Sequence, residues 1–340
     1  MNKITAYARL LRIPGLGALA IPPVIGALTV GMTDLPNLLI LFFIGAVSAM
    51  YGFILNDYAD IELDRLIPEL KGKPLVDGTI HPRTAVFICF FLVLLAFFFL
   101  FLLWRGQNLN DYKFLAMICI FLAGILGSIY DLRGKTLPGS DFFVAISMSF
   151  LFLLGALSFG APTIITWIIF ILTFNQALHM NAVEGGIKDA DHDFMMGVNN
   201  IALGSGVKVD GEKLYIPTSF KAFGMGIRLF SVVLLFTPFF FFKDQLIYYE
   251  PWQPLIIGIL AAAAFGVLFF SIKLLSLKRF ERNAIRKYIG IQSFLRYSLV
   301  PIMLIPIIGV VPSIILIIFP IAWYIIFTPL LGEKLFRPRM

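Results

Sequence analysis

Long runs of apolar residues dominate the chain, and short polar segments separate them. Most of these runs reach the roughly 20 residues that a helix needs to cross a bilayer. The pattern predicts spans at 14–33, 37–57, 85–104, 114–130, 141–159, 162–182, 223–243, 253–276, 292–310 and 313–331. Prolines interrupt the last two, which form either a hairpin of two spans or one span and a re-entrant segment. We therefore expect an all-α fold: a multi-pass transmembrane helical bundle of nine or ten spans.

Composition excludes a soluble globular protein. Hydrophobic residues make up 59% of the chain and charged residues only 14%, against about 25% charged in soluble domains. The two cysteines, Cys89 and Cys119, both lie in apolar runs, so neither a disulfide framework nor a zinc site is indicated. No cleavage site follows the first apolar run, and we expect residues 13–33 to stay in place as the first helix.

The distribution of positive charge predicts the orientation in the membrane. With ten spans, one side carries all of the 27 lysines and arginines except Arg105, Lys113 and Lys243. Cytoplasmic loops are enriched in lysine and arginine, so the rich side is expected to be cytoplasmic. The sequence thus predicts a multi-pass protein of the cell membrane. Because this topology accounts for the net charge of +7, no nucleic-acid partner is implied.

A first acidic cluster lies at the cytoplasmic end of the second predicted span, between Asn56 and Asp64. On a helix, Asp57, Asp60 and Asp64 fall within about 60° of one another, whereas Glu62 points elsewhere. Carboxylates on one stripe repel each other, and a helix C-terminus also disfavours negative charge. A divalent cation would remove both costs, and oxygen ligands without histidine or cysteine favour Mg²⁺.

A second acidic cluster follows the sixth predicted span, between Glu184 and Asp193. Asp189 and Asp193 share one helical face, and Asp191 lies on the opposite face. If the two clusters face each other, they could hold two or three Mg²⁺ ions around one diphosphate and neutralise it as a leaving group.

Basic residues suited to phosphate oxygens occur in the loops after the second, fourth and sixth spans. The candidates for diphosphate binding are Lys73, Tyr130, Arg133, Lys135 and Lys188.

These residues resemble the motifs of the UbiA superfamily of intramembrane prenyltransferases. The stretch Asn56-Asp57-x-x-Asp60-x-x-x-Asp64 matches the first motif of that family, and Asp189-x-x-x-Asp193 matches the second. The loop from Lys73 to Gly78 is similar to the family's Arg-Pro-hydrophobic-x-Ser-Gly loop, with lysine in place of arginine and aspartate in place of serine. Tyr130 with Lys135 resembles an element after the fourth span, and Arg12-Ile13-Pro14 resembles an Arg-Pro element near the first helix.

The resemblance implies one transmembrane prenyltransferase domain over residues 1–340, usually of nine spans, around a central cavity open to lipid and cytoplasm. It implies that a polyprenyl diphosphate ionises with Mg²⁺ as cofactor, and that an acceptor nucleophile captures the allylic cation. The catalytic residues would be Asp57, Asp60, Asp189 and Asp193. The metal ligands would be Asn56, Asp57, Asp60, Asp64, Asp189 and Asp193. Arg12 would bind the acceptor.

Two segments depart from the family pattern. Residues 205–222 contain an Asp-Gly pair typical of a hairpin turn, and we expect a β-hairpin or a lid there. The charged stretch 273–296 is long enough for an interfacial helix.

The sequence leaves the lipophilic acceptor open among a prenylated glycerol phosphate, which we favour, an aromatic quinone precursor and a sugar phosphate. A membrane transporter is the alternative of another class, but transporters place their acidic residues near the bilayer midplane. The oligomeric state is not predicted.

Overall fold

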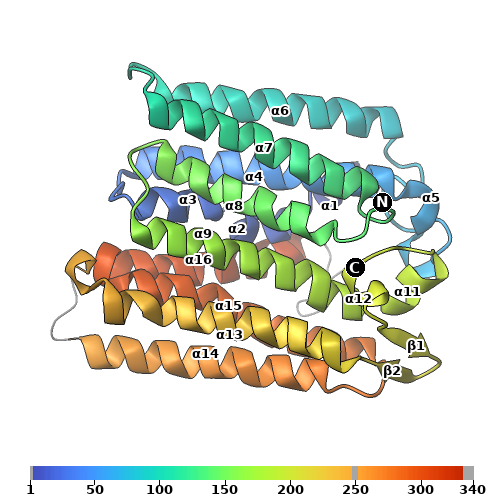
Figure 1. The fold of residues 1–340 in the computed structure, drawn as a ribbon. Coiled ribbons are helices and arrows are strands. Elements are labelled where there is room, and N and C mark those ends of the chain that lie inside the picture. Colours follow the sequence, from blue (N-terminus) through green and yellow to red (C-terminus); the bar gives the residue numbers. More distant parts are fainter. Residues whose placement is uncertain (1–2, 247–251, 332–340) are drawn as a thin grey trace. The chain divides into compact units, whose positions relative to one another are not determined.

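The computed structural model describes residues 3–246 and 252–331, and most of these residues are helical (Figure 1). Nine of the described helical segments are long and apolar enough to cross a membrane, and the apolar helix Asp141–Leu157 is shorter. The predicted all-α, multi-pass class is therefore confirmed. Within the described residues the span number is nine, or ten if the shorter helix also crosses.

The chain divides into two compact units, where the sequence predicts one domain. The first unit comprises Met1–Arg133, Ile146–Thr166 and Phe319–Met340. The second unit comprises Gly134–Ala145 and Trp167–Ile318.

The N-terminal part of the chain, up to residue 133, forms nine short or long helices. They are α1 (Lys3–Leu10), η1 (Ile13–Gly15), α2 (Leu16–Leu19), α3 (Pro22–Leu28), α4 (Leu35–Ala59), α5 (Ile61–Asp64), η2 (Pro68–Leu70), α6 (Pro82–Trp104) and α7 (Asp111–Arg133).

The rest of the chain adds the other long helices and one small sheet. These elements are α8 (Asp141–Leu157), α9 (Ile164–Leu178), η3 (His179–Gly185), α10 (Gly186–Lys188), α11 (Ala190–Met195), α12 (Ile201–Gly204), β1 (Lys208–Asp210), β2 (Lys213–Tyr215), α13 (Thr218–Phe241), η4 (Lys243–Gln245), α14 (Gln253–Leu275), α15 (Arg282–Ile308) and α16 (Val310–Leu330).

Helix α6 has one face that packs against protein and an opposite face that suits lipid. The face of α6 that packs inside the first unit carries the small residues Ala85, Cys89 and Ala96, all of them buried. Small residues let helix backbones approach closely in a membrane, where lipid is as apolar as any side chain. Phe87 and Phe98 are exposed on the other face, as suits a helix surrounded by hydrocarbon.

The first span, predicted at 14–33, instead covers Lys3–Leu28 and is broken into short helices. The breaks fall near Pro14 and Pro22, because proline lacks the N–H that a continuous helix needs. Trp323 repairs one break by donating its indole N–H to the carbonyl oxygen of Ile13 over 2.8 Å. Backbone that loses its helical partner inside a membrane has to find another one.

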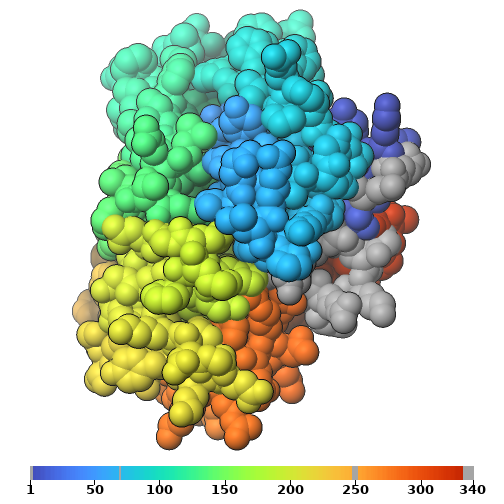
Figure 2. All heavy atoms as spheres, turned by 90° about the vertical axis from the view of Figure 1, so that its right-hand side faces the viewer, coloured from blue at the N-terminus to red at the C-terminus, as the bar shows by residue number. Residues whose placement is uncertain are grey.

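Residues 208–215 form a two-stranded antiparallel hairpin, in which Val209 pairs with Leu214. Gly211 has φ 56° in its two-residue loop, a positive value that hairpin turns require. The hairpin is also bonded to the turn between α14 and α15: the Leu214 N–H donates to the Lys278 carbonyl, and the Phe280 N–H donates to the Glu212 carbonyl. In Figure 2 the yellow-green atoms of the hairpin lie close to the orange atoms of this turn.

The charged stretch 273–296 does not form an interfacial helix of its own. Lys273 lies in the last turn of α14, a turn follows, and α15 begins at Arg282 and continues without interruption to Ile308. Arg296, at the end of this stretch, is buried inside the second unit, where it pairs with an acidic side chain. Gly309, with φ 86°, then separates α15 from α16, so the last apolar stretch forms two helices.

Candidate functional site

The first acidic cluster lies where α4 ends. The helix stops at Ala59, Asp60 leaves the helical conformation with ψ 0°, and the short helix α5 follows. Asp57, Asp60 and Asp64 are all buried, whereas the Glu62 side chain is 81% exposed. The predicted division between inward carboxylates and an outward Glu62 therefore holds, although the helix is interrupted inside the motif.

Lys73 joins two carboxylates of this cluster. Its Nζ donates to Asp57 Oδ1 over 3.0 Å and to Asp64 Oδ2 over 2.7 Å. Burial alone would lower the pKa of Lys73, but the two carboxylates outweigh burial and raise that pKa above its usual 10.5. Because the folded pKa is the higher one, this contribution to stability is fully present at neutral pH. It is lost only as the pH rises through the folded pKa.

Arg12 is the second cation of the first cluster. Its Nη2 donates to Asp57 Oδ1 over 2.8 Å, and its guanidinium lies 4.8 Å from the centre of the Phe53 ring. Arg12 has φ 48°, and it is the one non-glycine residue with positive φ in the described part of the chain. Such strain persists where the surroundings fix the residue, and it is often found at functional sites.

Asp131 on α7 is a fourth carboxylate at this cluster, and no site role is predicted for it from the sequence. Its Oδ2 lies 3.5 Å from the position that a Cβ on Gly52 would take. Asp131 also interacts electrostatically with Asp60, Arg12 and Asp57. The sequence signal for Asp131 is its position as an acidic residue at the end of an apolar run, where ionisable residues are candidates for function.

The diphosphate-binding residues predicted near the end of α7 belong to different units. Tyr130 and Arg133 belong to the last turn of α7 in the first unit, and Arg133 is exposed. Lys135 belongs to the second unit, where its carbonyl accepts a hydrogen bond from the Asn199 N–H.

The second acidic cluster lies on the short helices that follow α9. Asp189 separates α10 from α11, and its Oδ2 lies 3.2 Å from Lys188 Nζ. Asp193 accepts a hydrogen bond from Asn200 over 2.7 Å. Asp191 instead pairs with Arg282 at the start of α15. The predicted separation of Asp191 from Asp189 and Asp193 is thus visible in their different partners.

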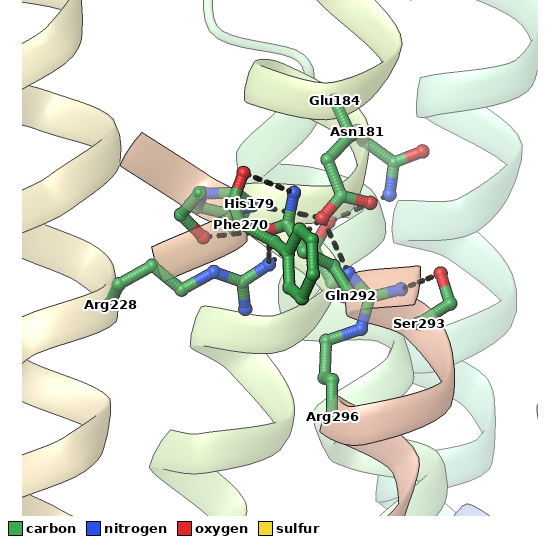
Figure 3. Close-up of polar contacts among 10 residues, drawn as sticks. His179, Asn181, Glu184, Arg228, Phe270, Gln292, Ser293 and Arg296 are labelled. Atoms are coloured by element: carbon green, nitrogen blue, oxygen red, sulfur yellow. Dashed lines mark hydrogen bonds and ion pairs between the residues drawn. The ribbon is translucent and has the colours of Figure 1, made fainter. Parts of the chain in front are cut away.

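A buried ionic network is centred on Glu184, the first residue of the second cluster (Figure 3). The π-helical segment η3 carries Glu184, whose Oε1 accepts from Arg228 Nη2 of α13 over 2.8 Å and from Arg296 Nη1 of α15 over 2.7 Å. Gln292 accepts from Ser271 of α14 over 2.7 Å and also lies next to Arg228.

The sequence does not predict this network, because its members come from four separate helices. Single π-helical turns often occur at functional sites. Here the two arginines bind η3 to α13 and α15, and η3 leads directly into the segment that carries Asp189.

The donor atoms of both clusters suit Mg²⁺, since they are carboxylate oxygens. Within residues 3–246 and 252–331, no group of three His, Cys, Asp or Glu side chains is gathered as a metal site. In the first cluster the carboxylates are instead drawn to Lys73 and Arg12. Asp57, Asp60 and Asp64 outnumber the two cations, so the cluster keeps a negative charge that a divalent cation would offset. The predicted metal and catalytic roles, and the expected pairing of the two clusters, stay predictions.

The comparisons with known proteins agree on one family. The family model of the UbiA prenyltransferase family matches residues 19–299. A 4-hydroxybenzoate octaprenyltransferase from Vesicomyosocius okutanii is 30% identical over 174 residues, which cover 51% of this chain and 60% of that relative. The protein of the same name from Francisella tularensis subsp. mediasiatica is 27% identical over 218 residues, 62% of this chain and 73% of that one.

Solved structures share the fold. A digeranylgeranylglyceryl phosphate synthase aligns with a TM-score of 0.64 at 19% identity, covering 91% of this chain and all of that one. A UbiA homologue from Archaeoglobus fulgidus bound to GPP and Mg²⁺ aligns with a TM-score of 0.61 at 21% identity, covering 90% of this chain and all of that one.

The substitution Glu184→Gln is expected to destabilise the second unit. It leaves two buried guanidinium groups without a counter-charge, and breaking a buried ion pair costs about 3–5 kcal/mol. Thermal unfolding of the purified protein in detergent measures the effect. Glu62→Gln, which breaks the exposed pair with Arg65, is the control and should change stability by no more than about 1 kcal/mol. Equal melting temperatures for the two variants would contradict the structural role of Glu184.

Proposed function

Because the chain belongs to the UbiA prenyltransferase family, we propose that each of its two acidic clusters binds Mg²⁺ for the diphosphate of a prenyl donor. Membership of this family favours an enzyme over the alternative of a membrane transporter. The chain is therefore a multi-pass membrane prenyltransferase. The observation that carries the proposal is the first cluster, where the buried Asp57 and Asp64 meet two cations that also suit phosphate oxygens.

The roles that we propose follow the two motifs. Asp57, Asp60 and Asp64, with Asn56, would hold Mg²⁺ at the end of α4, and Asp189 and Asp193 would do so in the second unit. Bound Mg²⁺ would neutralise the negative charge of the diphosphate. Lys73, Tyr130, Arg133, Lys135 and Lys188 would donate hydrogen bonds to phosphate oxygens. Arg12 would orient the acceptor.

The reaction breaks the bond between the first prenyl carbon and the diphosphate oxygen, and the electron pair leaves with the diphosphate. An electron pair of the acceptor, a lone pair on oxygen or a π pair of an aromatic ring, then forms the new bond to that carbon, and the acceptor loses a proton. Lysine and arginine side chains assist departure by hydrogen bonding to the oxygens on which charge develops.

Removal of either acidic motif is expected to abolish turnover. Asp60→Ala and Asp189→Ala each delete one carboxylate from a cluster, and we expect a loss of at least about 100-fold, as for other groups that stabilise transition-state charge. Transfer of label from a radioactive prenyl diphosphate to the acceptor measures the rate, and excess EDTA should have the same effect. Glu62→Ala is the matched control from the same motif and should stay active. Full activity in EDTA, or in both aspartate variants, would refute the assignment.

We propose a lipophilic acceptor with an anionic group, and two classes have specific support. The structurally similar synthase is named for a glycerol phosphate lipid, which agrees with the prenylated glycerol phosphate that we favour from the sequence. The relatives with 27–30% identity are named for 4-hydroxybenzoate, which supports an aromatic ring as the second candidate.

A panel of acceptors separates these two classes. Purified protein with Mg²⁺ and labelled geranylgeranyl diphosphate is expected to label geranylgeranylglyceryl phosphate faster than 4-hydroxybenzoate, by about tenfold or more if the headgroup contributes a specific contact. Both products are followed by thin-layer chromatography. Faster labelling of 4-hydroxybenzoate, also with an octaprenyl donor, would assign the aromatic class instead.

We also propose that both acidic clusters face the cytoplasm, on the evidence of the lysine and arginine distribution. Single cysteines introduced as Glu212→Cys in the hairpin and Gln107→Cys between α6 and α7 should then differ in labelling by a membrane-impermeant maleimide. In intact cells Gln107→Cys should react and Glu212→Cys should react only after permeabilisation. The native Cys89 and Cys119 are buried and give a low background. The reverse pattern would invert the topology.

A further inference from the structure

Lys73 lies at a point where a bound cation would be expected. Its ammonium group contacts one oxygen of Asp57 and one of Asp64, and these residues come from α4 and from the short helix α5. The side chains of the two aspartates are only 7% and 4% exposed, so water cannot neutralise them. Buried carboxylates need a paired cation, and Lys73 supplies one without any metal.

The backbone around Lys73 is fixed, whereas its side chain is long. The Lys73 N–H donates to Leu70, and the Lys73 carbonyl accepts from the N–H groups of Val76 and Asp77. Leu75 in the same loop is buried. The ammonium sits on a flexible four-carbon stem, so it can change partner while the loop stays in place.

We propose that Lys73 is an internal counter-cation that occupies the carboxylates of the first cluster until a diphosphate arrives, so that a divalent metal binds there only together with the diphosphate. The inference rests on the proposed function, because it concerns the same cluster. It adds that diphosphate and metal bind as a coupled pair, and that neither binds well alone.

The physical argument is competition for the same oxygen atoms. Mg²⁺ in proteins usually binds through one or two carboxylates together with substrate phosphates. While Lys73 holds Asp57 and Asp64, an incoming metal ion meets carboxylates whose charge is already offset, and Arg12 offsets Asp57 further. A diphosphate offers the ammonium another anion, which releases both carboxylates to the metal. The two ligands then favour each other, and this coupling is reciprocal.

Binding of Mn²⁺, a spectroscopic substitute for Mg²⁺, tests the proposal without turnover. Electron paramagnetic resonance of the full-length protein in detergent measures Mn²⁺ affinity with and without inorganic pyrophosphate. A background of Asp189→Asn with Asp193→Asn limits the measurement to the first cluster. In this background, pyrophosphate should tighten Mn²⁺ binding by about tenfold or more, within the usual range of coupled sites.

The substitution Lys73→Gln in the same background should remove the competition. Mn²⁺ should then bind tightly without pyrophosphate, and pyrophosphate should add less than about threefold, below the usual range of coupling. Lys73→Arg keeps the charge and should keep the coupling. Lys71→Gln, which changes an exposed lysine of the same loop, is the matched control and should behave like the parent.

Thermal unfolding gives a second readout and verifies that the variants fold. Without metal, Lys73→Gln should melt at a lower temperature than the parent, and Mn²⁺ alone should restore it, because the metal replaces the lost cation. Mn²⁺ alone should hardly change the melting temperature of the parent.

Two results would overturn the proposal in distinguishable ways. Equal Mn²⁺ affinities for the parent and Lys73→Gln, both unaffected by pyrophosphate, would refute the role of Lys73 while leaving the metal site in place. No Mn²⁺ binding in any variant, even with pyrophosphate, would refute metal binding by the first cluster and the inference with it.

Discussion

Buried negative charge has to be neutralised inside this protein, and that requirement shapes both units. In the first unit Lys73 and Arg12 hold Asp57 and Asp64. In the second unit Arg228 and Arg296 hold Glu184. A carboxylate that is removed from water is costly unless a cation and hydrogen bonds replace the lost hydration. Ion pairs therefore help to fix the loop after α5, which carries Lys73, and the segment η3, which carries Glu184.

Irregular backbone occurs next to these charges. Helix α4 ends inside the first acidic motif, η3 is π-helical immediately before the second, and Arg12 has a left-handed conformation. Regular helices would direct the same side chains elsewhere. Local strain of this kind persists only where other contacts fix it, and here the ion pairs supply such contacts. The irregular segments thus coincide with the residues that form these ion pairs.

The hairpin has a supporting place in the second unit. Its buried residues Leu214 and Ile216 share a hydrophobic cluster with Ile187 and Ala190, which flank Asp189. Backbone hydrogen bonds also join it to the turn between α14 and α15. Of the two forms expected for residues 205–222, the contacts describe a hairpin that packs with residues flanking Asp189. Such packing would keep the geometry of the proposed metal-binding side chains from being lost to loop motion.

Most of the fold and the two acidic motifs could be predicted from the amino-acid sequence. Apolar runs of membrane length specify helices, because a lipid environment allows few other structures. The helical repeat separates inward Asp57, Asp60 and Asp64 from outward Glu62, since side-chain direction follows from spacing alone. The Asp-Gly pair similarly located the hairpin turn.

Tertiary structure alone decided which charges meet. Glu184 pairs with Arg228 and Arg296 across 44 and 112 residues of sequence, and no periodicity encodes such partners. For the same reason Arg296, expected on an interfacial helix, is buried, and Asp131 joins a cluster from another helix. Lys73 is predicted from the sequence to bind diphosphate, and its contacts with two carboxylates become visible only in the structure. Spacing along a chain fixes the face of one helix, whereas the choice of a distant partner depends on how the helices pack and on the cost of leaving a buried charge alone.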